Sequence, residues 1–330
     1  MATPSEQTLL VTGANGFVAL HVIKEALSRG YHVRGTVRSE SSASKVRSVF
    51  QQHASKLSLS IVSDLTKPEL YQEAFAETIT PITGVIHVAA PFSLNIDDVT
   101  RDLLDPAVKN SVGILEATKK FGSNVRRIVN TSSFAAILDL GQGYRPGYTY
   151  SENDWNPMTY SEASTADAST AYCASKGLAE KTMWDWMERE QPSFSLASIN
   201  PPWIFGPHAL WRLVNATEVP PVDFGGFADV RVVAIAHLQA FEKPEAAGNR
   251  FLVGSHFDYH SAVEALVEEL PELKNRLPKG TPGAEQVGKV YALNGEKAKR
   301  VLGIDYIPLN KTMKDSFQQF LKAEKRVAAV

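Results

Sequence analysis

The N-terminal segment combines a short apolar run, a glycine-rich turn and a helical pattern, in that order. Residues 8–12 read TLLVT, and Gly13 and Gly16 follow directly. Apolar side chains then recur at helical spacing until Gly30, a residue type that commonly ends a helix. A buried strand, a glycine turn and a helix in this order form the setting of the dinucleotide-binding fingerprint. The segment therefore predicts the first part of a parallel α/β fold that binds a nucleotide.

The glycine turn departs from the usual fingerprint in one respect. Gly13 and Gly16 stand three positions apart, whereas the first two glycines of the common pattern are two apart. Gly13 still permits a tight turn, and Gly16 lets a pyrophosphate approach the backbone at the helix N-terminus. Ala19, in the third position, permits close packing of helix against strand. The alternative to a nucleotide loop is an ordinary glycine turn before a helix.

Apolar runs and helical patterns continue to alternate through the first half of the chain. Strand-like runs cover residues 31–37, 57–62, 84–90 and 127–133, and a helical pattern covers residues 105–121. Strands separated by helices indicate the doubly wound parallel sheet of a Rossmann fold, with right-handed crossovers. Ligands bind beyond the carboxyl ends of such strands. At those ends the sequence places Asp64, Ala89, Ala90, Ser132 and Ser133.

The residues after the second strand predict which dinucleotide binds. NAD-specific proteins place an acidic residue about 20 positions beyond the glycine loop, where it binds the ribose 2′-hydroxyl. This chain has Arg38 there, and a planar guanidinium suits the extra phosphate of NADP. Lys45, in the next helical pattern, offers a second positive charge. We therefore expect NADPH as the cofactor; the alternative is that Arg38 and Lys45 are solvated surface residues.

Tyr172 and Lys176 stand one helical turn apart in the run AYCASKG, so they share a helix face. A neighbouring ammonium favours the phenolate, and we expect it to lower the tyrosine pKa and make the phenol an acid–base group. Alone the pair is a weak signal. The Tyr172–Lys176 signal is stronger here because the chain opens with a glycine loop and carries the pair Ser132-Ser133 between that loop and Tyr172. Cys173 is expected to have no chemical role.

Composition excludes several other classes of protein. The 330 residues carry 34 basic and 36 acidic side chains, a net charge of −2, with no basic stretch suited to nucleic acid. No apolar run is long enough to span a membrane, and no secretory signal is visible. A single cysteine excludes an internal disulfide, so we expect a cytoplasmic protein. No metal is expected, because His208, His256 and His260 lack metal-ligand spacing.

The motifs together resemble the extended short-chain dehydrogenase/reductase family over nearly the whole chain. The matching segments are TGANGFVA (12–19), Asp64-Leu65, HVAAPF (87–92), NTSSFAA (130–136), YCASK (172–176) and NPPWIFGP (200–207). The branch it looks most like contains the NADPH-dependent ketoaldehyde (methylglyoxal) and carbonyl reductases, with dihydroflavonol and cinnamoyl-CoA reductases as cousins. TVRS (36–39) is similar to the NADPH signature of that branch.

The resemblance implies a role for each matching residue. It implies a catalytic triad of Ser133, Tyr172 and Lys176, in which the serine orients a carbonyl, the tyrosine donates a proton and the lysine tunes the tyrosine. It implies that the cofactor is contacted by Gly13, Asn15, Gly16, Phe17, Val18, Arg38, Lys45, Asp64, Leu65, Val88, Ala89, Ala90, Tyr172, Lys176, Pro201 and Pro202. The asparagine that joins the triad in other short-chain enzymes is not evident, because Asn110 lies out of register.

The second half of the chain is less regular. We expect a Rossmann domain of residues 1–201 plus about 227–250, and a smaller C-terminal substrate-binding lobe of about 202–226 and 251–330. Within that half, residues 229–241 have a helical pattern, residues 249–254 are strand-like, and Ser261 to Glu264 form a capping box. Three aromatic residues beyond the cofactor motifs are candidates for an apolar substrate pocket, although aromatic side chains are more often plain core. They are Phe92, Phe134 and Trp203.

The predicted function is NADPH-dependent reduction of aldehydes and ketones, with methylglyoxal, keto esters and prochiral ketones as substrates. Two alternatives remain. A nucleotide-sugar epimerase or dehydratase uses the same triad, although Arg38 in place of an acid argues against tightly held NAD. A non-catalytic NADP-binding redox sensor is the other. The segment 208–223 is shorter than its counterpart in the relatives of the family, which predicts a more open substrate cleft. The protein is expected as a monomer or homodimer.

Overall fold

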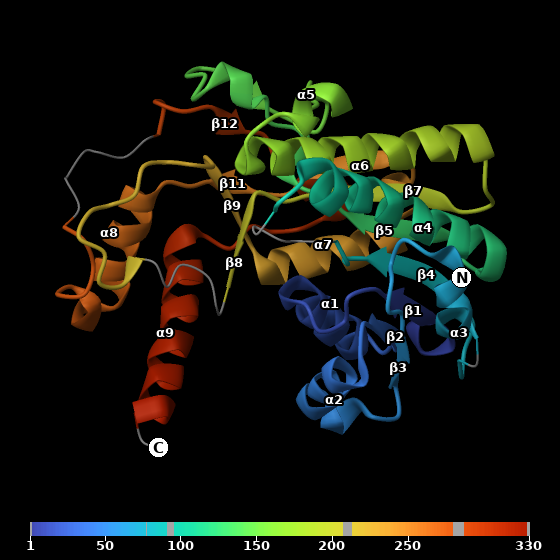
Figure 1. Ribbon diagram of the computed structural model, residues 1–330. Helices are drawn as coiled ribbons and strands as arrows, with labels where there is room; N and C mark the ends of the chain where they lie inside the picture. Colours follow the sequence, from blue (N-terminus) through green and yellow to red (C-terminus); the bar gives the residue numbers. More distant parts are fainter. Residues whose placement is uncertain (1, 77, 91–95, 207–212, 280–286, 329–330) are drawn as a thin grey trace. The chain divides into compact units, whose positions relative to one another are not determined.

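The computed structural model describes residues 2–76, 78–90, 96–206, 213–279 and 287–328, and the chain divides into two compact units. The first unit contains residues 1–140, 152–200 and 234–251. The second unit contains residues 141–151, 201–233 and 252–330 (Figure 1). None of the helices in the described part of the chain is both long and apolar enough to cross a bilayer.

A seven-stranded sheet forms the centre of the first unit. Its strand order is β10-β7-β5-β4-β1-β2-β3. The pairs of β1 with β2 and of β1 with β4 are parallel, as are the pairs β2–β3, β4–β5 and β5–β7. This sheet confirms the predicted Rossmann-like α/β fold. The strands are β1 (Thr8–Val11), β2 (His32–Val37), β3 (Leu57–Ile61), β4 (Ile82–His87), β5 (Arg127–Thr131), β7 (Ser195–Asn200) and β10 (Asn249–Leu252).

The chain order creates a switch point in this sheet. From β1 the chain builds outward through β2 to β3, and it then returns to place β4 on the other side of β1. The loops after β1 and β4 therefore leave the sheet side by side in opposite directions, which opens a crevice for a ligand at their carboxyl ends. Both loops carry residues that the sequence predicts as cofactor contacts.

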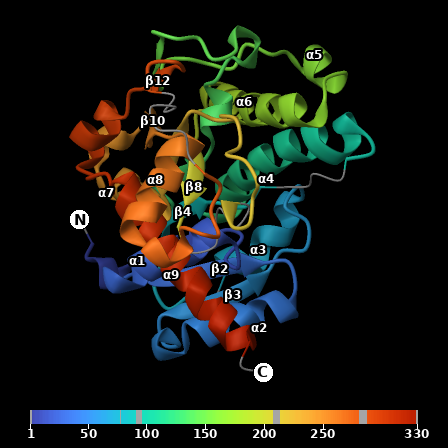
Figure 2. The same cartoon turned by 90° about the vertical axis from the view of Figure 1, so that its left-hand side faces the viewer.

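Helices cover the two faces of the sheet. They are α1 (Phe17–Ser28), α2 (Glu40–Val49), α3 (Gln72–Phe75), α4 (Asp105–Phe121), α6 (Ala168–Glu190) and α7 (Val230–Glu242). The short helix α5 (Tyr160–Ser164) packs on α6. Figures 1 and 2 show α4 and α6 side by side on one face, with α1 on the other. Leu10 and Ile128 of the strands pack with Ile114 of α4 and Trp186 of α6 in one apolar cluster. Burial of these side chains fixes the position of α6 against the sheet.

The second unit is built from short strands and two helices. Its strands are β6 (Thr149–Tyr150), β8 (Trp203–Phe205), β9 (Gly226–Asp229), β11 (Ser255–His256) and β12 (Ala292–Leu293), and its helices are α8 (Tyr259–Glu269) and α9 (Leu309–Ala328). An aromatic cluster of Phe205, Phe227, Phe257 and Tyr259 packs with Phe317 of α9. This separate core explains why the unit is compact by itself.

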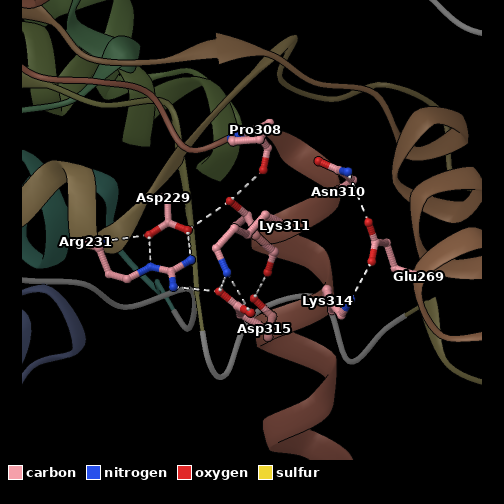
Figure 3. Close-up of polar contacts among 10 residues, drawn as sticks. Asp229, Arg231, Glu269, Pro308, Asn310, Lys311, Lys314 and Asp315 are labelled. Carbon is pink, nitrogen blue, oxygen red and sulfur yellow. Dashed lines mark hydrogen bonds and ion pairs between the residues drawn. The ribbon is translucent and has the colours of Figure 1, made fainter.

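A buried ion-pair network lies beside that core. Asp229 accepts two hydrogen bonds from the Arg231 side chain and one of 2.9 Å from the Thr312 hydroxyl. Arg231 also pairs with Asp315 of α9 at 2.6 Å (Figure 3). The network ties the end of β9 and the start of α7 to α9, and the Asp229 carboxylate is fully buried within it.

Three boundaries differ from the sequence-based expectations. Helix α8 begins after Asp258, whose Oδ1 accepts the Ser261 backbone N–H at 2.8 Å, so Ser261 and Glu264 do not form the predicted capping box. Residues 141–151 belong to the second unit, because β6 pairs with β12. Residues 227–233 also belong there, because β9 pairs with β8 and β11.

Candidate active site

The glycine loop after β1 forms a close-packed cradle at the start of α1. Gly13 has a φ of +66°, and a Cβ there would lie 3.1 Å from the Cα and Cβ of Ala89. The position therefore requires glycine on grounds of both conformation and space. Gly16 is the N-cap of α1 and offers no side chain to cap it, so the first N–H groups of the helix are available to an anion. These two observations fit the pyrophosphate of a dinucleotide.

Asn15, Phe17 and Val18 belong to the same turn and the first positions of α1. Asn15 is exposed, while Phe17 and Val18 are half-buried, so all three have surface that a ligand could contact. The Phe17 ring packs edge-to-face on His21, with 5.5 Å between the ring centroids.

Thr12 joins the loop after β4 to the loop after β1. Its Oγ1 accepts the backbone N–H groups of Val88 and Ala89, both at 3.0 Å, and lies 3.0 Å from His87 Nδ1. Thr12 Oγ1 is thus bonded to three groups, and the other ring nitrogen of His87, Nε2, lies 3.4 Å from the Asn110 amide nitrogen. Burial lowers the pKa of His87 to about 3, so the ring is neutral. Val88 to Ala90 are thereby fixed beside Gly13.

Arg38 follows β2 directly, and Lys45 lies within α2. Both are exposed, and no ion pair joins either side chain to another residue in the described part of the chain. Glu40, the acidic residue nearest to Arg38 in sequence, is paired with Arg47 instead. The two cations are therefore available to an anionic group. Solvated surface residues without a ligand would be exposed in the same way.

Asp64 and Leu65 follow β3 and have different surroundings. Asp64 Oδ1 accepts the N–H of Thr66 at 2.9 Å and its hydroxyl at 2.7 Å, and these hydrogen bonds hold the pKa of Asp64 below its ordinary value. Its carboxylate is therefore ionised and fixed at the strand end. Leu65 packs against the apolar cluster between the sheet and α4.

The tyrosine and lysine of the predicted triad lie on one face of α6. The Lys176 Nζ is 5.3 Å from the centroid of the Tyr172 ring. Burial raises the pKa of Tyr172 to about 12 and lowers the pKa of Lys176 to about 8. The expectation that the ammonium lowers the tyrosine pKa is thus corrected, because desolvation is the larger effect on both groups.

Ser133 stands at the start of a short 3₁₀ turn after β5. Its Oγ accepts the backbone N–H of Ala135 at 3.1 Å, and no described residue accepts the hydroxyl hydrogen. That hydrogen is available to a substrate oxygen. Phe134, the next residue, has no exposed surface, so it belongs to the core, which corrects the pocket role expected for it.

A cavity of about 30 Å³ lies between α4, α6 and the sheet. It is lined by both polar and apolar side chains, with Lys176, His87 and Asn110 among the polar ones, and it has room for a water molecule. Asn110 donates to the Ala89 carbonyl at 2.9 Å, while its buried Oδ1 has no partner among the described residues. Asn110 is therefore brought to Lys176, although the sequence register did not assign it. The packing of α4 on α6 is what brings the two together.

Three of the remaining predicted residues, Pro201, Pro202 and Trp203, belong to the second unit. Pro201 and Pro202 are buried there, and Pro202 packs against Gly226 and Gly254. Trp203 is 40% exposed, and its indole N–H donates to Asp223 at 3.1 Å. Phe92 lies outside the described residues, as does His208. Within the described part of the chain, no group of three or more His, Cys, Asp or Glu side chains is arranged as a metal site.

Comparison with known proteins gives consistent matches. Residues 9–216 match the NAD dependent epimerase/dehydratase family. The NADPH-dependent methylglyoxal reductase GRE2 of Saccharomyces cerevisiae is 35% identical, with 97% of this chain and 100% of the relative covered. A cinnamoyl-CoA reductase, CAD2, of Medicago truncatula is 31% identical over 96% of this chain and 95% of its own. The crystal structure of the yeast methylglyoxal/isovaleraldehyde reductase Gre2 complexed with NADPH has a TM-score of 0.89, at 35% identity, and covers 97% of this chain and 99% of that one.

Proposed function

Since the chain belongs to the NAD dependent epimerase/dehydratase family, as its motifs predicted, we propose that it is an NADPH-dependent reductase of aldehydes and ketones. Among the relatives that match it over nearly its whole length, that of Saccharomyces cerevisiae is named an NADPH-dependent methylglyoxal reductase, that of Aspergillus niger a ketoreductase and that of Medicago truncatula a cinnamoyl-CoA reductase. The observation that carries the proposal is the half-buried Tyr172–Lys176 pair on α6, in the same unit as a glycine cradle open to an anion. Together they supply a proton donor and a nucleotide site.

The first unit fits a bound dinucleotide phosphate. Gly13 and Gly16 would receive the pyrophosphate at the start of α1, and Arg38 and Lys45 would hold the 2′-phosphate. Asp64 and Leu65 would border the adenine, and Val88 to Ala90 the ribose. The family motif NPPWIFGP (200–207) assigns Pro201 and Pro202 to the nicotinamide. These positions follow the order of the family motifs along the chain.

NADPH, when bound, supplies the hydride that reduces the carbonyl carbon of the substrate. The Ser133 hydroxyl would donate a hydrogen bond to the carbonyl oxygen and orient it, since a carbonyl oxygen can only accept, while the Ala135 N–H holds the Ser133 oxygen in place. A tyrosine with a raised pKa stays protonated at neutral pH, so Tyr172 can give its proton to that oxygen as charge develops. Lys176 then stabilises the phenolate with its ammonium.

Of the aromatic candidates for the substrate pocket, we assign Trp203 to the substrate, because its side chain is exposed whereas that of Phe134 is buried. Its indole would contact the apolar part of a carbonyl compound, which agrees with a range of aldehydes, keto esters and aryl ketones as substrates. An epimerase or dehydratase role has less support, because Arg38 replaces the acid typical of NAD binding.

The test is NADPH oxidation over a panel of methylglyoxal, 2,5-diketones, β-keto esters and aryl ketones. The Tyr172→Phe variant should lose turnover by about 10²-fold or more, the scale of a missing general acid, while its NADPH affinity stays near that of the parent protein. Fluorescence titration with NADPH measures that affinity. Near-normal turnover by Tyr172→Phe would show that the proton comes from another group and would overturn the mechanism.

A further inference from the structure

Helix α6 carries a third polar residue on the face of Tyr172 and Lys176. Glu180 stands one turn beyond Lys176, and its side chain is 1% exposed. A carboxylate is almost never buried to this degree unless it is paired. No motif of the chain assigns a role to Glu180, and the mechanism above does not use it.

The Glu180 carboxylate is the centre of a hydrogen-bond cluster. Its Oε2 accepts the Ser132 hydroxyl at 2.6 Å and the Asn200 amide at 2.7 Å. Its Oε1 accepts Arg250 Nε at 2.9 Å and Trp184 Nε1 at 3.3 Å, and Arg250 Nη2 reaches Oε2 at 3.2 Å. Burial alone would raise the pKa of Glu180, but the Arg250 guanidinium and these hydrogen bonds hold it below its ordinary value. The group is therefore ionised and acts as an acceptor only.

Two of these contacts lead directly to Ser133. Ser132 is its neighbour in the chain, so the hydrogen bond to Glu180 fixes the peptide on one side of it. The Asn200 amide nitrogen that donates to Glu180 also donates to the Ser133 carbonyl oxygen at 3.2 Å. The carboxylate thus holds the backbone of Ser133 from two directions.

Arg250 keeps that carboxylate in one place. Its Nη1 donates to the carbonyl oxygens of Glu152 at 2.6 Å and Asp154 at 2.8 Å. Its guanidinium lies over the Trp155 ring, 3.4 Å from the ring centroid. Because the planar guanidinium donates to acceptors on two sides and lies on an aromatic face, the ion pair has little freedom to shift.

We propose that Glu180, held by Arg250, is a positioning residue that sets the orientation of the Ser133 hydroxyl toward the substrate carbonyl. This inference rests on the proposed reductase function for its kinetic consequence. It assigns to α6 a ladder of three residues at intervals of one turn: the proton donor, the cation that stabilises it, and the carboxylate that orients the serine.

The decisive variant is Glu180→Gln, which keeps the shape of the side chain but turns one acceptor oxygen into a donor. It cannot accept from Ser132, Asn200 and Arg250 together, so the Ser133 backbone loses at least one of its supports. We expect kcat to fall by about 10- to 100-fold, as for a catalytic group displaced by up to 1 Å, with a KM for NADPH within about threefold of the parent protein. Ser132→Ala, which spares the ion pair, should lower kcat in the same direction.

The matched control is Asp229→Asn, which removes the charge of an equally buried carboxylate paired with an arginine in the second unit (Figure 3). Each protein is assayed at a temperature where circular dichroism shows it folded. We expect kcat of Asp229→Asn within about twofold of the parent, because its carboxylate makes no hydrogen bond to the Ser133 segment. Equal losses of kcat in Glu180→Gln and Asp229→Asn, or an unchanged kcat in Glu180→Gln, would overturn the positioning role.

Hydrogen exchange separates this inference from the proposed function. Amides of residues 130–138, measured without substrate, should exchange faster in Glu180→Gln than in the parent protein and should be unaffected in Asp229→Asn. If the parent protein reduced no carbonyl of the panel, the proposed function would fall, and the exchange data would still decide the role of Glu180. Unaltered exchange of this segment in Glu180→Gln would refute it.

Discussion

Lys176 lies half-buried on α6 with its ammonium over the ring of Tyr172, and burial lowers its pKa from 10.5 to about 8. No hydrogen bond or ion pair joins that ammonium to another residue in the described part of the chain. The folded protein therefore carries an unfavourable charge, which the proposed mechanism needs. Replacing Lys176 with methionine, which has a similar length and no charge, should stabilise the protein and abolish turnover.

The size of the effect follows from the pKa. One unit corresponds to about 1.4 kcal/mol, so the fall from 10.5 to about 8 sets an upper limit of about 3 kcal/mol for the cost of the charge. Part of the Lys176 side chain remains exposed, and water screens part of that cost. We therefore expect Lys176→Met to raise the free energy of unfolding by about 1–2 kcal/mol at pH 7.

The dependence on pH gives the sharper measurement. Below pH 8, Lys176 is protonated in the folded and the unfolded protein, so the cost is fully present. Between pH 8 and 10.5 the folded protein releases this proton first, and its stability rises relative to that of Lys176→Met. Urea unfolding at pH 7 and pH 9.5, without nucleotide, should therefore show the advantage of the variant shrinking as the pH rises.

The matched control is Tyr172→Phe, which should retain the pH dependence of the parent protein over this range. The pKa of Tyr172, raised to about 12, lies above it. An advantage of Lys176→Met that stays constant from pH 7 to 9.5 would come from apolar packing alone and would refute the reasoning. A less stable variant at pH 7 would refute it as well.

Two further substitutions test the nucleotide site. Gly13→Ala should lower the free energy of unfolding by about 1–2 kcal/mol, because alanine is strained at a φ of +66° and its Cβ would contact Ala89. The affinity for NADPH should fall as well. If urea unfolding and fluorescence titration with NADPH both matched the parent protein, the close approach of residue 13 to Ala89 would be excluded. Arg38→Ala should raise the KM for NADPH by about 10- to 100-fold, because it removes a hydrogen bond to a charged group, and should leave the KM for NADH nearly unchanged. Equal changes in KM for the two cofactors in steady-state kinetics would contradict the phosphate role of Arg38.

The parts of the fold that were predictable depend on local periodicity. The runs at residues 8–12 and 84–90 are apolar because β1 and β4 are buried between two layers of helices, and such runs identify themselves without knowledge of their neighbours. Gly13 and Gly16 were recognisable for the same reason, since the turn they form involves only adjacent residues. The placement of Ser133, Tyr172 and Lys176 in one unit also agrees with the order of the motifs.

The features that the sequence did not predict depend on contacts between distant segments. Asn110 reaches Lys176 only because α4 packs on α6, and that packing leaves no mark on the local pattern. Phe134 follows Ser133, the serine proposed for catalysis, yet the 3₁₀ turn after β5 directs it into the core. Asp258 rather than Ser261 caps α8, because both residues are good caps and only the backbone conformation decides between them.

Helix α6 explains why polar residues are the hardest to read. Buried residues occur on more than one side of this helix: Trp186 packs in the apolar cluster, while Glu180 is buried among hydrogen-bond donors. On an ordinary surface helix the charged side chains face solvent, so Lys176 and Glu180, four residues apart, would predict an exposed face. Here that face is closed by Arg250, Ser132 and Asn200, contributed by strands or by the loop that follows one. Burying a carboxylate costs free energy unless both of its oxygens are hydrogen-bonded. The presence of such a carboxylate beside Ser133, where an apolar side chain would cost less, supports a role for Glu180 in orienting that serine.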